Sequence, residues 1–148
     1  MSAPRFHPGD LVEISLPDGL LYVHVLQRPA SYPYVVRVLP GLHATRPKDP
    51  TQLIDAAKDS GTVALIPLGE VLERLGYGAE TVAQAAIVNA PRFRMAVRDR
   101  AGRVLYWWFW DGDTLSYTDD PDDADNALPL REITGADRFK ALLGEIAS

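Results

Sequence analysis

Residues 92–117 constrain the fold of this chain most strongly, because two turn signals divide them into three short runs of strand-forming residues. The segment Asp-Arg-Ala-Gly at 99–102 is typical of a hairpin loop that ends in a glycine with left-handed backbone. Asp111-Gly112 is typical of a two-residue type I′ turn. The stretch therefore predicts a three-stranded antiparallel meander with Val104 to Trp110 as its central strand.

The first turn also predicts a pairing register. If Asp99 pairs with Arg103, side-chain alternation gives the hairpin one wholly apolar face. That face comprises Phe93, Met95, Val97, Leu105, Trp107 and Phe109, with Phe93 opposite Phe109. The other face, called here the arginine face, comprises Arg92, Arg94, Arg98, Tyr106, Trp108 and Trp110, with Arg94 opposite Trp108 and Arg98 opposite Val104. The second turn adds Asp113, Leu115 and Tyr117 to the arginine face, beside Trp110, Trp108 and Tyr106 respectively.

Two interpretations of the arginine face stay open. In the structural one, the arginine side chains lie over the indole rings and cover a second core layer, with cation–π contacts worth about 0.5–1 kcal/mol each when exposed. In the functional one, the face binds a partner, since Trp, Tyr and Arg are enriched at binding hot spots. The candidate partner-binding residues are Arg92, Arg94, Arg98, Tyr106, Trp108 and Trp110.

The length and composition fit one ordinary globular domain. The 148 residues are predicted to form a single domain, 1–148, with enough hydrophobic residues (47%) for a substantial core. The chain contains no cysteine, which excludes disulfides, thiolate nucleophiles and cysteine-based metal sites. No apolar run reaches the roughly 20 residues of a membrane span and no signal-peptide pattern opens the chain, so we expect a cytoplasmic protein that does not bind membranes.

The net charge of −5 argues against a general nucleic-acid-binding function, which needs a basic surface. Arginines cluster within residues 92–103, and aspartates collect within residues 119–125. The carboxylates at 119–126 lack the central glycine and distal glutamate of a calcium-binding loop, so a solvated acidic loop is favoured.

The N-terminal part predicts a second antiparallel meander. Residues 9–16 alternate as a strand that points Val12, Ile14 and Leu16 to one side, and Pro-Asp-Gly at 17–19 turns the chain into a return strand at 20–27. A third strand is expected at 34–39. Such a meander is common in small SH3-like barrels.

The remaining segments supply short helices and one ambiguous element. Short helices are expected near 52–58 and at 70–75, the second ending at Gly76, with an apolar strand between them at 62–68. Residues 79–88 fit either a helix or a strand. A last helix is expected to dock on the sheet through residues at helical spacing, namely Phe139, Leu142, Leu143 and Ile146. The predicted fold class is α+β, with antiparallel meanders forming a bent sheet or a partly open SH3-like barrel, and short helices and a C-terminal helix packed on it.

The chain carries no spacing typical of a catalytic or metal site. The three histidines, His7, His24 and His43, have no helical metal-binding partner, and neither a nucleophile elbow nor a phosphate-binding glycine loop is present. We therefore expect no metal and no cofactor. An enzyme whose site is assembled from distant residues stays open as an alternative, because such a site leaves no spacing signal.

The stretch from Gly9 to Gly19, followed by the strand at 22–26, resembles the opening of polymorphic-toxin immunity family 26. Proteins of that family typically begin with Gly-Asp, an alternating strand that ends in residues like Pro-Leu-Pro-Asp-Gly, and an aromatic-bearing return strand. This chain departs from the pattern at Ser15, where proline is expected, and at Leu20-Leu21 after the turn. The resemblance covers roughly the first quarter of the chain. It implies a small cytosolic protein that binds and neutralises a secreted toxin without catalysis of its own.

The favoured prediction is a non-catalytic protein-binding module, of the kind represented by immunity-type inhibitors of bacterial toxins. The alternative from another class is a small-molecule-binding protein or enzyme with a pocket lined by tryptophan and arginine. A purely structural or oligomerisation domain is the third hypothesis.

Overall fold

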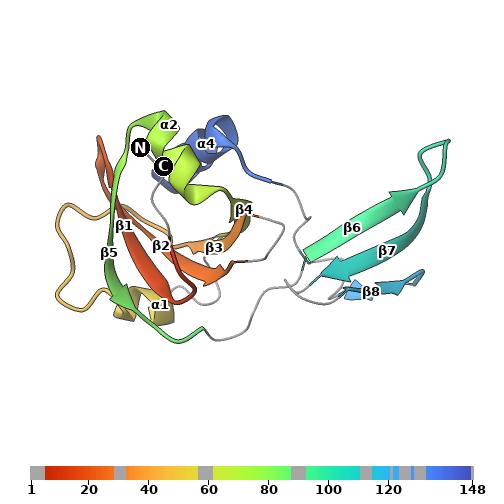
Figure 1. The fold of residues 1–148 in the computed structure, drawn as a ribbon, viewed down its shortest axis with the longest axis horizontal. Coiled ribbons are helices and arrows are strands. Elements are labelled where there is room, and N and C mark those ends of the chain that lie inside the picture. The colour runs from red at the N-terminus through yellow and green to blue at the C-terminus, as the bar shows by residue number, and fades with distance from the viewer. Residues whose placement is uncertain are drawn as a thin grey trace. The chain divides into compact units, whose positions relative to one another are not determined.

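The computed structural model describes residues 6–28, 33–56, 62–87, 93–110, 115–120, 122–123, 128 and 133–147. The chain divides into two compact units, which are described separately: Met1–Val88 with Ile133–Ser148, and Asn89–Glu132. Across the described residues the first unit contains five strands and three helices, and the second contains three strands (Figure 1).

The first unit is built on the predicted N-terminal meander. Strands β1 (Asp10–Leu16) and β2 (Gly19–Gln27) form the predicted hairpin, but Leu16 pairs with Gly19, so the turn is Pro17-Asp18 alone and Gly19, expected in the turn, opens β2. Strand β3 (Tyr34–Val38) pairs antiparallel with β2. Gly19 has φ +148°, and a Cβ there would lie 3.1 Å from the carbonyl oxygen of His43, so a larger residue would push the neighbouring loop away.

Two further strands extend this sheet at its edges. Strand β4 (Thr62–Ile66) pairs with β3, and β5 (Gly78–Gln84) pairs with β1, which gives the antiparallel order β4-β3-β2-β1-β5. The ambiguous segment 79–88 is therefore a strand over its first part. Its cross-strand pairing with β1 decides between the two structures that its sequence allowed, as tertiary context does for weak local preferences.

Helices α2 (Leu68–Leu75) and α4 (Ala136–Ala147) cover one face of this sheet (Figure 1). The predicted glycine ends α2: Gly76 has φ +73°, and its N–H and that of Tyr77 donate to carbonyls of the last turn. Residues from both helices join the alternating strand residues in one core. Its buried members are Phe6, Val12, Ile14, Leu21, Val23, Val25, Val36, Val38, Ile66, Leu68, Val71, Leu72, Phe139 and Leu143.

The opposite face of the sheet is covered in part by the segment after β3 and by α1 (Gln52–Ala56). Leu11, Tyr22 and Leu39 form a small buried cluster there, with Leu53 and Ile54 of α1 packed against it. His43 forms an isolated bridge with Leu20, so the segment is also held to β2 by backbone hydrogen bonds.

The Gly9-Asp10 pair that opens β1 has a structural explanation. Gly9 has φ +94°, its N–H donates to the carbonyl of Val25, and its carbonyl accepts from the N–H of Ala85. The buried Asp10 carboxylate accepts from the His7 N–H at 2.9 Å and from the Gln84 side chain at 2.9 Å. The pair therefore joins the start of β1 to β2 and β5.

The second unit is a three-stranded antiparallel sheet of β6 (Phe93–Arg98), β7 (Val104–Trp110) and β8 (Leu115–Thr118), in the order β6-β7-β8. The predicted α+β class with antiparallel sheets, short helices and a C-terminal helix is confirmed. Among the described strands, neither sheet closes into a barrel. Residues 121 and 124–126 of the expected acidic loop lie outside the described residues.

We expect the substitution Phe139→Ala to lower the free energy of unfolding by about 3–5 kcal/mol, because the ring is fully buried where α4 meets the sheet. Urea unfolding followed by circular dichroism would measure the loss. Lys140→Ala, one residue along on the exposed side of α4, is the matched control and should change stability by less than about 0.5 kcal/mol. Equal stabilities for the two variants would contradict the docking of α4 on this core.

Candidate functional site

The loop between β6 and β7 folds as its sequence predicts. Gly102 has φ +88° and its N–H donates to the carbonyl of Asp99 at 3.1 Å. The Asp99 side chain accepts from the N–H groups of Ala101 and Arg103 at 2.9 and 3.0 Å, and the Asp99 N–H donates to the Arg103 carbonyl at 2.9 Å. The expected pairing of Asp99 with Arg103 is therefore confirmed, as is that of Arg98 with Val104.

The register beyond this point differs from the prediction by one residue. An irregularity between Val97 and Arg98 leaves Leu105 as an extra residue in β7, so that Val97 pairs with Tyr106 instead of Leu105. Such a β-bulge exchanges the two faces for everything that follows, because side chains alternate along a strand. Phe93 now lies opposite Trp110, and Arg94 lies opposite Phe109 rather than Trp108. The predicted arginine face is wrong for this reason.

The register of β8 also differs, by two residues. Leu115 pairs with Trp110 and Tyr117 with Trp108, where the sequence predicted Trp108 and Tyr106. The described part of β7 ends at Trp110 and that of β8 begins at Leu115, so the structure does not test the predicted two-residue turn between them. Asp111, Gly112 and Asp113 themselves lie outside the described residues. A shift of two residues leaves every side chain of β8 on its predicted face, because side chains alternate along a strand. Leu115 and Tyr117 therefore lie on the same face as Trp108, as predicted.

The corrected register gathers a different set of side chains on one face of the sheet. We call it the aromatic face; its members are Phe93, Met95, Val97, Tyr106, Trp108, Trp110, Leu115 and Tyr117. None of these residues is charged. Trp107 and Phe109 lie on the reverse face with Arg94, Ala96 and Arg98.

The aromatic face passes from buried to exposed across the sheet. Phe93 and Trp110 are buried and their ring centroids are 5.9 Å apart. Tyr106 and Trp108 are half-buried, whereas Tyr117 on β8 is 70% exposed. The rings of Tyr106, Trp108 and Tyr117 contact one another with centroids 5.5–6.1 Å apart. Edge-to-face and tilted arrangements of this kind are the ones that aromatic pairs prefer.

The predicted partner-binding arginines have structural contacts on the reverse face. The Arg94 guanidinium lies 4.9 Å from the ring centroid of Trp107, and its Nε donates to the carbonyl of Leu128 at 2.8 Å. Arg98 donates to the carbonyl of Gly102 at 2.8 Å. Arg92 lies outside the described residues. The structural interpretation therefore fits Arg94, and the exposed aromatic rings lie on the other side of the sheet.

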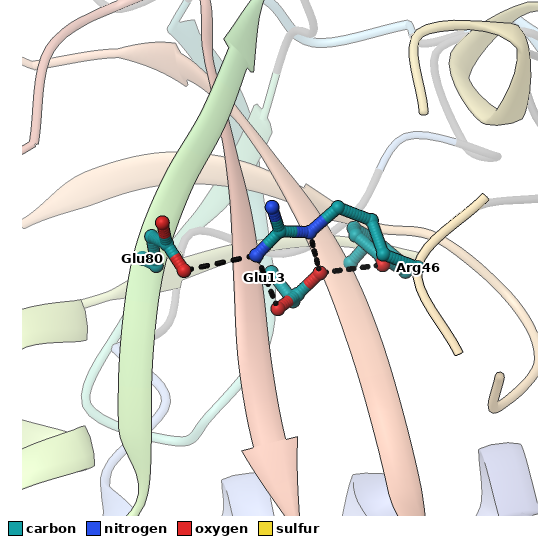
Figure 2. Close-up of polar contacts among 4 residues, drawn as sticks. Glu13, Arg46 and Glu80 are labelled. Atoms are coloured by element: carbon teal, nitrogen blue, oxygen red, sulfur yellow. Dashed lines mark hydrogen bonds and ion pairs between the residues drawn. The ribbon is translucent and has the colours of Figure 1, made fainter. Parts of the chain in front are cut away.

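A second cluster, which the sequence analysis missed, joins three segments of the first unit. Glu13 on β1 is buried and pairs across the sheet with Tyr22 on β2 and Glu80 on β5. Arg46, from the segment after β3, donates to both Glu13 oxygens at 2.7 and 3.1 Å and to Glu80 at 2.9 Å (Figure 2). The Tyr22 hydroxyl donates to Glu13 at 2.7 Å. No spacing in the sequence signals this cluster, since Arg46 lies 33 residues from Glu13.

These contacts stabilise one protonation state of each group. The hydrogen bonds from Arg46, together with that from Tyr22 and the Arg46 charge, lower the pKa of Glu13 despite its burial. Burial, and then the hydrogen bond to Glu13, raises the pKa of Tyr22. The carboxylate of Glu13 is thus held ionised and the phenol of Tyr22 neutral near pH 7, so neither group is suited to exchange a proton there.

His24 is a further buried titratable group of the first unit. Its Nε2 lies 3.3 Å from the carbonyl oxygen of Ala85, and within the described part of the chain its Nδ1 has no hydrogen-bond partner. Burial lowers the pKa of His24, which favours the neutral ring.

We expect the contribution of Glu13 to stability to disappear in acid. Because its folded pKa lies below the ordinary value of 4.5, ionisation of Glu13 stabilises the fold above about that pH, and the contribution is lost as the pH falls through the folded pKa. The melting temperature of the native chain should therefore fall more steeply from about pH 6 to pH 3 than that of Glu13→Gln. Glu73→Gln on the exposed side of α2 controls for the loss of one carboxylate. Parallel curves for the native chain and Glu13→Gln would contradict the role given to Arg46.

Among the described residues, no group of three or more histidine, aspartate or glutamate side chains is placed to hold a metal ion. No helix within the described ranges is long and apolar enough to cross a membrane. Comparisons with protein-family models, with curated proteins and with solved structures find no match for this chain.

Proposed function

We propose that this chain is a non-catalytic protein-binding module that contacts its partner through the aromatic face of the β6–β7–β8 sheet. The observation that supports this most directly is the exposure of apolar side chains on β8, where Leu115 is 53% and Tyr117 70% exposed. Both continue a surface of packed rings, so they are part of a contiguous patch and not scattered apolar residues.

The composition of the patch favours a protein partner. Tyrosine and tryptophan bury large areas while losing few rotamers, and they carry much of the binding energy at protein interfaces. The rings of Tyr106, Trp108 and Tyr117 already contact one another, so binding would require little further ordering of these side chains.

The polar cluster around Glu13 supports a function without catalysis. Arg46 joins Glu13 to Glu80, and these groups, together with Tyr22, satisfy one another's hydrogen bonds. Because Glu13 stays ionised and Tyr22 stays neutral near pH 7, these two groups stabilise the structure and are not suited to transfer protons at that pH.

The narrower form of the proposal is an immunity-type inhibitor that neutralises a bacterial toxin. It is supported by the resemblance of Gly9 to Gly19 and the following strand to the opening of polymorphic-toxin immunity family 26. Such an inhibitor needs a surface that binds tightly and no reaction chemistry of its own, and the aromatic face fits that requirement.

We expect Tyr117→Ala to weaken partner binding at least tenfold, which corresponds to about 1.4 kcal/mol, with little change in melting temperature because the ring is mostly exposed. The partner would be captured from cells that express the chain, identified, purified and titrated by calorimetry against each variant. Leu115→Ala and Leu105→Ala form a matched pair, because these leucines are 53% and 54% exposed but only Leu115 belongs to the aromatic face.

The proposal predicts weaker binding by Leu115→Ala and unchanged binding by Leu105→Ala. Equal affinities for the native chain and Tyr117→Ala would contradict it. So would a loss of several degrees in melting temperature without any change in affinity, since Tyr117 would then act only in the core.

A further inference from the structure

Strand β8 differs from the other strands that end a sheet in this chain. Exposed sheet edges invite pairing with other chains, and proteins usually protect them with charge, proline or a covering segment. Strand β6 carries Arg94 and Arg98, and β5 carries Glu80. Strand β4 has no charged residue, but Leu65 is bridged by Ile133 and accepts a hydrogen bond from the Thr134 N–H.

Among the described residues, β8 has no such protection. Its sequence, Leu-Ser-Tyr-Thr, contains no charge, no proline and no glycine. Within the described part of the chain, β8 pairs with β7 on one side and no strand pairs with its other edge. Leu115, Ser116 and Tyr117 are all exposed residues.

The residues that flank β8 favour one kind of occupant. The chain carries Asp111 and Asp113 shortly before β8, and Asp119 and Asp120 directly after it. If the β8 strands of two copies paired antiparallel, the residues that precede β8 in one copy would lie next to the residues that follow β8 in the other. Aspartates would then face aspartates at both ends, which destabilises a second copy on this edge. A strand that ends in lysine or arginine would instead gain opposite-charge pairs at the same positions.

We propose that the outer edge of β8 accepts, by strand addition, an extended segment of a protein partner with apolar side chains at alternate positions and basic residues at its ends. This inference rests on the proposed function and specifies the partner's chemistry. The added strand would place its apolar side chains beside Leu115 and Tyr117, because strand residues two apart share a face. Backbone hydrogen bonds would supply the pairing, and the aromatic face would supply the buried apolar area.

The test uses a capped heptapeptide of alternating threonine and valine with a lysine at each end, titrated into the ¹⁵N-labelled chain. We expect amide shifts concentrated in residues 115–118 and weak binding, with a Kd of about 0.1–1 mM, because β8 is short. The same peptide with glutamate at each end should bind at least tenfold more weakly. The same peptide N-methylated at every backbone nitrogen, which cannot donate a hydrogen bond along either edge, should not bind.

A charge reversal provides the sharpest control. The double variant Asp119→Lys, Asp120→Lys keeps aspartates at only one end of β8, so it should bind the lysine and glutamate peptides about equally. Asp122→Lys, Asp123→Lys, which lies further from β8, should keep the native preference for the lysine peptide. Shifts that avoid β8, equal binding of the two peptides by the native chain, or dimerisation of the peptide-free chain in light scattering would overturn the inference.

Failure of strand addition can be told apart from failure of the binding module. If a captured partner depends on Tyr117 but neither the lysine peptide nor the aspartate variants has any effect, the aromatic face binds by another mode and only the inference falls. If the partner is also insensitive to Tyr117→Ala, the proposed function falls with it.

Discussion

The sheet of the second unit depends on one extra residue in β7. The loop pairs Asp99 with Arg103, and Arg98 follows opposite Val104, but Val97 is then paired with Tyr106. Every side chain beyond the bulge changes face as a consequence. Without it, Arg94 would lie opposite Trp108 and a guanidinium would lie among the exposed rings. With it, Arg94 stacks on Trp107 on the reverse face, and the aromatic face is uncharged.

In the first unit, the comparable constraint is the carboxylate of Glu13. A glutamate in the middle of a strand, buried and opposite Glu80, is unfavourable by itself, because like charges face each other across the sheet. Arg46 resolves this by binding both carboxylates, and in doing so it holds the segment after β3 against the sheet. The same segment provides the hydrophobic contacts of Leu39 and α1 around Tyr22. Burial of Tyr22 and neutralisation of Glu13 therefore depend on one another.

The sequence predicted turns, strands and a helix end that depend on neighbouring residues. It did not predict contacts between residues far apart in the chain. The N-terminal hairpin, the alternation of Val12 and Ile14 and the helix end at Gly76 follow from backbone preferences and side-chain period, and the structure has them as expected. The register of β6 and β7 could not be obtained in this way. Because β7 is apolar on both sides, a slip of one residue exposes no charge and buries none, so the pattern does not distinguish the two registers. The cluster of Arg46, Glu13 and Glu80 could not be predicted either, because it joins residues from separate parts of the chain.

A residue that the fold requires for its own structure gives no separate support to a proposed function. The Gly9-Asp10 pair, with which the resemblance to an immunity family begins, is required by the fold: the glycine has positive φ and the aspartate joins β1 to β5. Its presence is therefore explained without a partner. Tyr117 has no such explanation, because a ring that is 70% exposed contributes little to the core beneath it. It contacts Trp108 at 5.5 Å on a strand whose outer edge is unpaired among the described residues. The fold thus leaves this aromatic ring largely exposed without a structural need for it, and burial of its apolar surface is what the proposed partner would gain.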